Sequence, residues 1–130
     1  MILEIKIPMK NAGIWMDREK AHIVVLEGGK EHLVTLLSGI NINYENTGEN
    51  KTSINYSETD KRLLSNYFNE IISYVKEVEA LALYGNDVAF LKFETYLREN
   101  FEAIDFKIID VHNAEPMTVH QVSKLIQNHY

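Results

Sequence analysis

The chain has 130 residues, of which 45% are hydrophobic. This length lies within the usual range for one domain and supplies enough apolar surface for a core of ordinary size, so we expect a single domain over residues 1–130. A total of 13 basic and 19 acidic residues gives a net charge of -6, which weakens long-range attraction to DNA and to anionic membranes. We therefore expect no membrane association and no DNA binding, and any RNA contact has to be local.

The absence of cysteine excludes a disulfide framework, a thiolate zinc site and a cysteine nucleophile. The first ten residues alternate isoleucine with charged side chains, without the basic start and continuous apolar stretch of a secretory signal. No run approaches the ~20 apolar residues that cross a bilayer. We expect a cytoplasmic protein, whose residues 1–10 form either a flexible lead or an extra edge strand.

Two apolar runs flank a charged tetrad at residues 17–20. The first run predicts a strand from residue 12 to about residue 18, and the second predicts a strand over residues 21–27, with a tight bend at Glu19 and Lys20. We interpret the tetrad as a hairpin bend first and as a recognition surface second.

The dipeptide Gly28-Gly29 predicts a two-residue hairpin, because both loop positions need a positive φ, and a third strand then runs from residue 31 to about residue 40. In this register paired residue numbers sum to 57, which places His32 opposite Val25 and leaves His22 on the other face of the sheet. The two histidines therefore share no metal ion.

Residues 41–56 contain several asparagines and no periodic apolar pattern, which is typical of a long mobile loop. Its Tyr44 and Tyr56 are candidates for stacking on RNA bases, and its Lys51 is a candidate phosphate contact. Trp15 is another aromatic candidate, although a tryptophan in a buried strand is more often part of the core.

Helices and strands alternate in the rest of the chain. An apolar stripe predicts a helix over residues 57–78, and a short apolar run predicts a buried strand over residues 80–85. Asp87 is suited to cap the next helix, which turns Phe90, Phe93, Leu97 and Phe101 inward. A fifth strand is predicted over residues 106–111, and the capping box from Thr118 to Gln121 opens a last helix that ends near residue 129.

The predicted order is βββαβαβα. A meander followed by right-handed crossovers gives an α/β fold with a mixed five-stranded sheet in the order 3-2-1-4-5, in which strands 1, 4 and 5 are parallel. The carboxyl ends of those three strands meet at one edge, where open α/β sheets tend to bind ligands. The residues that this arrangement brings toward the edge are Asp17, Asn86, Asp87, His112 and Asn113.

The same strand order is the plan of ribonuclease H-like nucleases, which hold two metal ions between carboxylates. Asp17, Asp87 and Asp110 are the candidates for such a site. The simpler explanation is structural, because Asp17 is a turn former, Asp87 a helix cap and Asp110 a strand-end acid. A third hypothesis is a homo-oligomeric scaffold in which the exposed edge of the third strand pairs with a second copy.

No standard catalytic signature is found. The glycines match neither the Walker nor the dinucleotide fingerprint, and the serine beside Gly39 lacks the pattern of a nucleophile elbow. We therefore expect no cofactor and no resident metal.

Three segments of the chain resemble a known group in order and place: "AGIWMDREKAHIVVLEGG", "ALALYGNDVAFLKFETYL" and "IIDVHNAEPMTVHQVSKLIQNHY". They are similar to small bacterial proteins related to the central domain of archaeal and eukaryotic peptide-chain release factors and of Pelota. The resemblance implies the translational-machinery-component fold, with the same element order, and association with ribosomes in rescue or termination.

The chain departs from that group at its functional residues. Release factors carry a Gly-Gly-Gln tripeptide in the loop after the third strand, whereas residues 41–56 hold one glycine and no glutamine. Hydrolysis of peptidyl-tRNA is therefore not predicted. Our leading hypothesis is a non-enzymatic binding or regulatory protein that contacts the ribosome or RNA through the long loop and the first bend. Its candidate binding residues are Asp17, Arg18, Lys20, Tyr44, Lys51, Tyr56, Asn86, Asp87 and His112.

Overall fold

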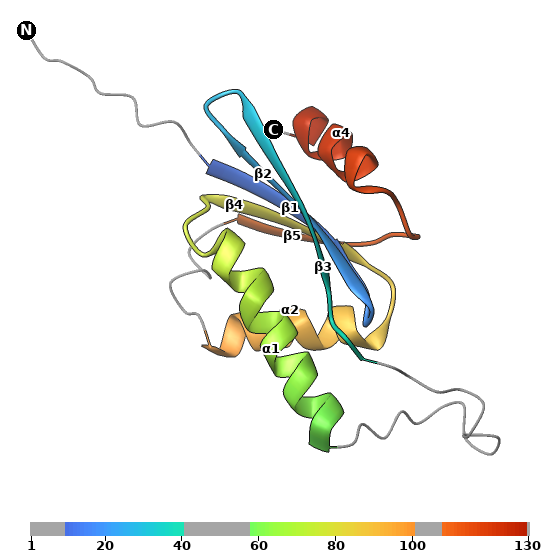
Figure 1. The fold of residues 1–130 in the computed structure, drawn as a ribbon. Coiled ribbons are helices and arrows are strands. Elements are labelled where there is room, and N and C mark those ends of the chain that lie inside the picture. Colours follow the sequence, from blue (N-terminus) through green and yellow to red (C-terminus); the bar gives the residue numbers. More distant parts are fainter. Residues whose placement is uncertain (1–9, 41–57, 101–107, 130) are drawn as a thin grey trace, which may run out of the picture.

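The fold is a mixed five-stranded sheet with helices on both faces (Figure 1). The computed structural model describes residues 10–40, 58–100 and 108–129. Its strand order is β3-β2-β1-β4-β5, with β1, β4 and β5 parallel and the β1–β2 and β2–β3 pairs antiparallel. The fold class predicted from the sequence is confirmed. In chain order the elements are β1 (Lys10–Met16), β2 (Lys20–Glu27), β3 (Lys30–Leu37), α1 (Glu58–Val75), β4 (Ala80–Gly85), α2 (Val88–Asn100), β5 (Ile108–Asn113) and α4 (Val119–His129).

The sheet separates two apolar clusters, as expected when successive side chains of a strand point to opposite faces. The larger cluster joins the sheet to α1 and α2, and includes Ile14, Ile23 and Leu83 from the strands. The smaller cluster lies under α4 and contains Trp15, Val24, Ala82, Tyr84, Val122 and Ile126. Trp15 is fully buried, so it belongs to the core and is not available for stacking on bases.

The β2–β3 hairpin has the predicted register. Gly28 and Gly29 have φ values of 57° and 79°, the left-handed values that a two-residue type I′ loop requires. His32 pairs with Val25, and His22 pairs with Thr35. The two histidines lie on opposite faces, as predicted.

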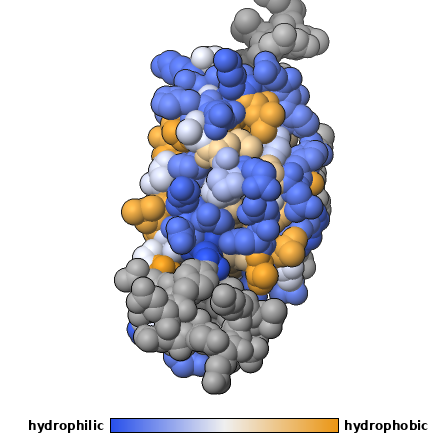
Figure 2. Space-filling view, turned by 90° about the vertical axis from the view of Figure 1, so that its right-hand side faces the viewer, coloured by the Kyte–Doolittle hydropathy of each residue, from blue (hydrophilic) through white to orange (hydrophobic). Residues whose placement is uncertain are grey.

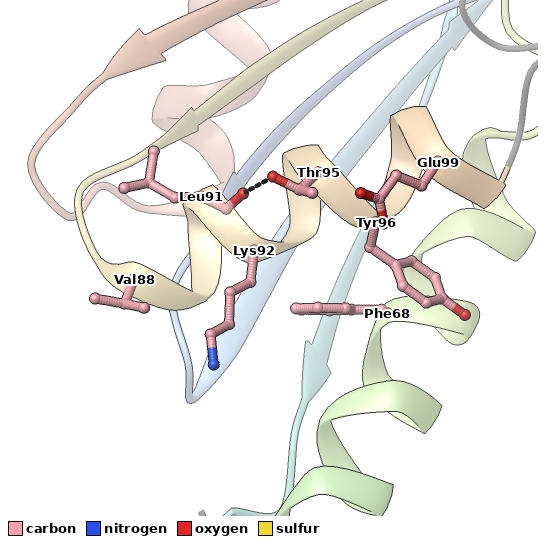
Figure 3. A pocket seen from close by; sticks show the side chains of 7 residues that line it. All are labelled: Phe68, Val88, Leu91, Lys92, Thr95, Tyr96 and Glu99. Atoms are coloured by element: carbon pink, nitrogen blue, oxygen red, sulfur yellow. Dashed lines mark hydrogen bonds between the residues drawn. The ribbon is translucent and has the colours of Figure 1, made fainter. Parts of the chain in front are cut away.

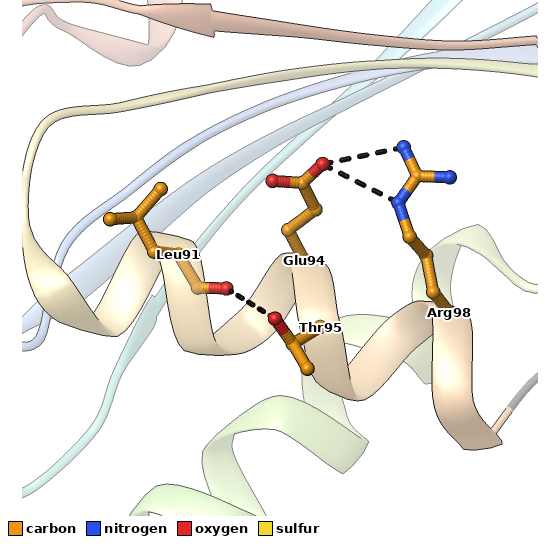
Figure 4. Close-up of polar contacts among 4 residues, drawn as sticks. All are labelled: Leu91, Glu94, Thr95 and Arg98. Atoms are coloured by element: carbon orange, nitrogen blue, oxygen red, sulfur yellow. Dashed lines mark hydrogen bonds and ion pairs between the residues drawn. The ribbon is translucent and has the colours of Figure 1, made fainter.

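Local side-chain hydrogen bonds mark the start of α4 and support the exposed face of α2. The predicted capping box of α4 is present, because Gln121 N–H donates to Thr118 Oγ1 (3.1 Å) and Thr118 N–H donates to Gln121 Oε1 (2.8 Å). On α2, Arg98 donates to Glu94 one turn earlier, and the Thr95 hydroxyl donates to the Leu91 carbonyl (Figure 4). The Arg98–Glu94 pair, on the exposed face of α2, stabilises the helix by a few tenths of a kcal/mol.

A glycine lets α4 lie close against the sheet. A Cβ atom at Gly13 would overlap the side chain of Ile126, which is fully buried. The α4 helix is also attached to both edge strands of the sheet, because Ser123 and Gln127 donate to Glu31 of β3 and His129 Nε2 lies 2.7 Å from Asp110 Oδ2 of β5.

On the side of the molecule shown in Figure 2, hydrophobic side chains form separate patches among hydrophilic ones.

Several element boundaries differ from the prediction by two or three residues. β1 covers 10–16 instead of 12–18, because its antiparallel ladder continues to the Lys10–Glu27 pair and ends at Met16. β3 ends at Leu37 and not near Ile40, since Gly39 turns the chain with a φ of 75°. β5 extends to Asn113, two residues beyond the prediction, because Gly85 of β4 is still available as its partner. For β1 and β5 the neighbouring strand sets the length, and for β3 the turn at Gly39 does.

Five predicted features fall partly or wholly outside the described residues. They are the lead or edge strand at residues 1–10, of which only Lys10 is described, the loop at 41–56, the first residue of the helix predicted over 57–78, the first two residues of the strand predicted over 106–111, and the inward position of Phe101. In the part of the chain that the structure describes, no helix is long and apolar enough to span a membrane.

Candidate functional site

The charged tetrad forms the tight turn between β1 and β2. The Asp17 N–H donates to the Lys20 carbonyl (3.0 Å), which makes Arg18 and Glu19 the two loop residues. The predicted bend at Glu19 and Lys20 was therefore displaced by one residue. Asp17 Oδ1 accepts hydrogen bonds from the N–H groups of Glu19 (2.8 Å) and Lys20 (2.9 Å). Both loop residues keep a negative φ, because no described non-glycine residue has a positive one, and aspartate at the first position is the residue that such a turn favours.

The turn is attached to three other elements. Tyr67 of α1 donates its hydroxyl proton to the Asp17 carbonyl (2.9 Å). Ser38, just after β3, donates its hydroxyl to the Arg18 carbonyl (2.6 Å) and its N–H to the Glu19 carbonyl (2.9 Å). The main chain of the turn is thus fixed from two directions, and Asp87 adds a third.

Asp87 connects the turn to the start of α2. Its Oδ2 accepts the Arg18 N–H (3.0 Å), while its Oδ1 accepts the Phe90 N–H (3.0 Å). The second bond is the helix cap predicted from the sequence. Because one carboxylate holds both groups, the β1–β2 turn and the α2 N-terminus lie side by side at the carboxyl end of the parallel strands.

Burial and charge keep Tyr67 in its donor form. The pKa of its hydroxyl is raised well above the ordinary value, first by burial and then by the nearby carboxylates of Asp17 and Asp87. The hydroxyl therefore stays protonated even in alkaline solution, where an ordinary tyrosine ionises, and continues to hold the turn.

Replacing Tyr67 with phenylalanine tests this contact. We expect the free energy of unfolding to fall by about 1 kcal/mol, because the change leaves the Asp17 carbonyl without its partner and keeps the ring packing. Urea unfolding measures the difference. Tyr74→Phe, at an exposed position of the same helix, is the matched control and should change little. Equal stability of the two variants would contradict the assignment.

A row of side chains crosses the α4 face of the sheet next to the turn. The strand registers align Thr35, His22, Trp15, Tyr84 and His112. Within this row, His22 Nδ1 lies 2.8 Å from Thr35 Oγ1, and the Tyr84 and His112 rings stack with centroids 5.3 Å apart. Burial, and then the charge of Lys20, lower the pKa of His22, with Asp17 acting in the opposite direction. His22 is therefore neutral at neutral pH.

The predicted site residues are only partly brought together. Asp17, Arg18, Lys20 and Asp87 form one cluster around the turn, and Asn86 is exposed beside it. His112 is also exposed, on the last strand of the same edge. Tyr44, Lys51 and Tyr56 lie outside the described residues.

The three carboxylates of the nuclease hypothesis do not meet. Asp110 pairs with Ala82 in the β4–β5 ladder, three positions before Gly85, so it lies roughly 10 Å short of the edge at ~3.3 Å per residue. There it contacts His129, while Asp17 and Asp87 hold main-chain N–H groups. Among the described residues no group of three His, Asp or Glu side chains is placed to hold a metal ion.

Two residues that fix the turn were not predicted from the sequence. Tyr67 was counted only as part of the apolar stripe of its helix, although a buried tyrosine hydroxyl usually has a partner, and that signal could have marked it. Ser38 was considered only as a nucleophile. Its partners lie about twenty positions earlier in the chain, where a sequence pattern gives no sign of them.

A shallow groove lies elsewhere, between α1 and α2 (Figure 3). Seven side chains line it: Phe68, Val88, Leu91, Lys92, Thr95, Tyr96 and Glu99. Inside it the rings of Phe68 and Tyr96 lie with centroids 5.5 Å apart, and the Tyr96 hydroxyl donates to Asn69. The groove contains none of the predicted site residues.

Comparisons with known proteins identify the fold. Neither protein-family models nor curated proteins give a match. Among solved structures, the chain is similar to the Pelota protein of Thermoplasma acidophilum, with 20% identity, a TM-score of 0.55 and coverage of 93% of this chain and 33% of that one. Pelota of Archaeoglobus fulgidus gives 13% identity, a TM-score of 0.58 and coverage of 95% and 32%. An archaeal translation termination factor gives 14% identity, a TM-score of 0.47 and coverage of 92% of this chain and 38% of that one.

The chain therefore has a fold that is also found in Pelota, and it spans about a third of the length of the Pelota chains it matches. The resemblance noted in the sequence is confirmed at this level.

Proposed function

We propose that this protein is a non-enzymatic, cytoplasmic binding or regulatory protein of release-factor-domain ancestry, which contacts ribosomal RNA through the β1–β2 turn. Arg18 and Lys20 are the phosphate contacts on the turn. Asn86 and His112 extend the surface along the sheet edge. Tyr44, Lys51 and Tyr56 belong to the segment 41–56, which lies outside the described residues, and we propose them as further contacts from the sequence alone.

The observation that carries the proposal is the way in which the turn is held. Its main-chain carbonyls accept hydrogen bonds from Tyr67 and Ser38, and its Arg18 N–H donates one to Asp87. A loop that is already fixed loses little conformational entropy when it binds. The free energy of its contacts is therefore not reduced by the cost of ordering the chain. Arg18 and Lys20 are both half-buried, and their side chains start from this fixed main chain.

The acidic residues support binding in preference to catalysis. Asp17 Oδ1 and both oxygens of Asp87 accept main-chain N–H groups. A carboxylate committed in this way has a structural role, and its negative charge is partly balanced by the donors. Phosphate groups can then approach the two basic side chains despite the net charge of -6.

The fold supports a partner in translation. Pelota has the same arrangement over most of this chain, with TM-scores of 0.55 and 0.58. One of the weaker structural matches is a translation termination factor. Ribosomal RNA is the phosphate-rich partner that these similarities favour.

Sedimentation of the full chain with ribosomes tests the proposal. At low salt, where phosphate contacts are strongest, we expect the protein to migrate with ribosomal particles in a sucrose gradient and to be released as salt rises. The double variant Arg18→Glu with Lys20→Glu should remain in the soluble fraction.

The matched control carries the same change in charge at the other end of the sheet. Lys30→Glu combined with Lys124→Glu alters two exposed lysines away from the turn, so this variant should migrate as the wild type does. Wild-type protein that stays soluble at low salt would overturn the proposal, and so would equal loss of binding in the two double variants.

A further inference from the structure

No strand of the described residues covers the outer edge of β3. β3 is the first strand of the sheet order, and within residues 10–40, 58–100 and 108–129 it has only β2 as a strand neighbour. The N–H of Ser38 donates to Glu19 on the β2 side. Because hydrogen-bonding direction alternates along a strand, the even-numbered residues of β3 bond to β2, and the odd-numbered residues direct their N–H and C=O groups outward.

This edge lacks the features that usually prevent strand pairing. Charged residues, proline and short length protect exposed edges in most proteins. β3 is eight residues long and has no proline, and its charged residues, Lys30 and Glu31, both lie at the hairpin end. Glu31 is also engaged by Ser123 and Gln127 of α4. The stretch from Leu33 to Leu37 is left uncharged, and Leu37 is 74% exposed.

The uncharged stretch is nearly symmetric about Thr35. Its sequence, Leu-Val-Thr-Leu-Leu, has leucine two positions away on either side and an aliphatic residue one position away on either side. In an antiparallel pair of two such strands, centred on Thr35, Leu33 of each copy would lie opposite Leu37 of the other, and Val34 opposite Leu36. Thr35 would then face its own copy, a favourable cross-strand pair.

We propose that two copies of this chain associate through their β3 edges, antiparallel and with the two-fold axis at Thr35. In this register the outward groups of Leu33, Thr35 and Leu37 form the hydrogen-bonded pairs, each of which exchanges two main-chain bonds. The exposed Leu37 side chain packs beside Leu33 of the second copy. The sheet then continues from one copy into the other, and the β1–β2 turn stays outside the pairing because it lies on the other side of β2.

The occupant is a second copy because the pattern is complementary to itself. On one face Leu33 and Leu37 meet each other, and on the other face Val34 meets Leu36. The charged residues Lys30 and Glu31 lie outside the matched residues 33–37. The interface is small compared with stable dimers. The association is therefore weak and depends on protein concentration.

Cysteine cross-linking tests the register, because the natural chain contains no cysteine. In a hydrogen-bonded pair the two Cα atoms are about 5.5 Å apart, which a disulfide can span. Thr35→Cys should therefore form a covalent dimer under mild oxidation. Lys30→Cys is the control, since its two copies would lie roughly 33 Å apart at ~3.3 Å per residue. Equal rates for the two variants would overturn the proposal.

Sedimentation equilibrium of the full chain tests the association itself. Between about 1 μM and about 1 mM we expect a shift from monomer to dimer, and Leu37→Asp should raise the dissociation constant by at least about tenfold. Leu91→Asp, at another exposed leucine on α2, is the matched control and should leave it unchanged. A monomer at every concentration would overturn the proposal, as would a dimer that Leu37→Asp does not weaken.

Discussion

Replacing Gly85 with alanine is expected to lower the free energy of unfolding by about 2 to 3 kcal/mol. A Cβ atom at this position would lie 2.5 Å from Cγ of Phe90 and 2.7 Å from the carbonyl oxygen of Met16. The Phe90 ring is 1% exposed, and the Met16 carbonyl belongs to β1. Neither can yield without moving α2 or the sheet. The need for glycine here comes from this close approach, since the φ of Gly85 is not positive.

Urea unfolding of Gly85→Ala against the wild type measures this loss. Asn86→Ala changes the exposed neighbouring residue and should alter stability by less than about 0.5 kcal/mol. If both variants unfold like the wild type, β4 and the start of α2 do not approach as closely as the geometry at Gly85 indicates.

Replacing Asp87 with alanine is expected to cost about 2 to 3 kcal/mol. The change removes the cap of α2, worth about 1 kcal/mol, and also leaves the Arg18 N–H without its acceptor. Thermal or urea unfolding gives the total. Amide hydrogen exchange of Arg18 isolates the second part, since that amide should exchange faster in the variant.

Asp87→Asn separates the two roles of this residue. The amide keeps one oxygen that can accept the Phe90 N–H, but its NH₂ group cannot accept the Arg18 N–H. We therefore expect about half of the loss seen with alanine, together with the same faster exchange at Arg18. Asparagine that matches the wild type in both measurements would contradict the bridging role of Asp87.

Both substitutions act on the same structural unit. Gly85 and Asp87 sit where β4 leads into α2, and they bring the helix start against the β1–β2 turn. A variant that loosens this contact should weaken partner binding as well as stability, because the turn would no longer be held in place before binding.

Local patterns predicted much of the fold. The dipeptide Gly28-Gly29 fixed the register of the β2–β3 hairpin, since only glycine adopts the positive φ of both loop positions without strain. Thr118 with Gln121 marked the start of α4, and Asp87 marked the start of α2. In each case the signal and the structure it produces lie within four residues of each other.

Contacts between distant parts of the chain were not predicted. The Tyr67 hydroxyl meets a carbonyl fifty positions earlier, and His129 at the end of α4 meets Asp110 of β5, nineteen positions earlier. These contacts follow from how α1 and α4 pack on the sheet. An apolar stripe shows which face of a helix is buried, but not which residues of the sheet that face meets. The nuclease trio shows the same gap, because the strand end that Asp110 was expected to occupy lies three positions further along β5.

The most direct measurement is the salt dependence of the affinity of the full chain for purified ribosomes. We expect the logarithm of the association constant to fall linearly with the logarithm of salt concentration. The variant Arg18→Ala with Lys20→Ala should reduce the slope by about 1.5, as loss of two phosphate contacts requires. Lys30→Ala with Lys124→Ala should keep the wild-type slope. A wild-type affinity that does not change with salt, or equal slopes for the wild type and the turn variant, would contradict RNA contact through the β1–β2 turn.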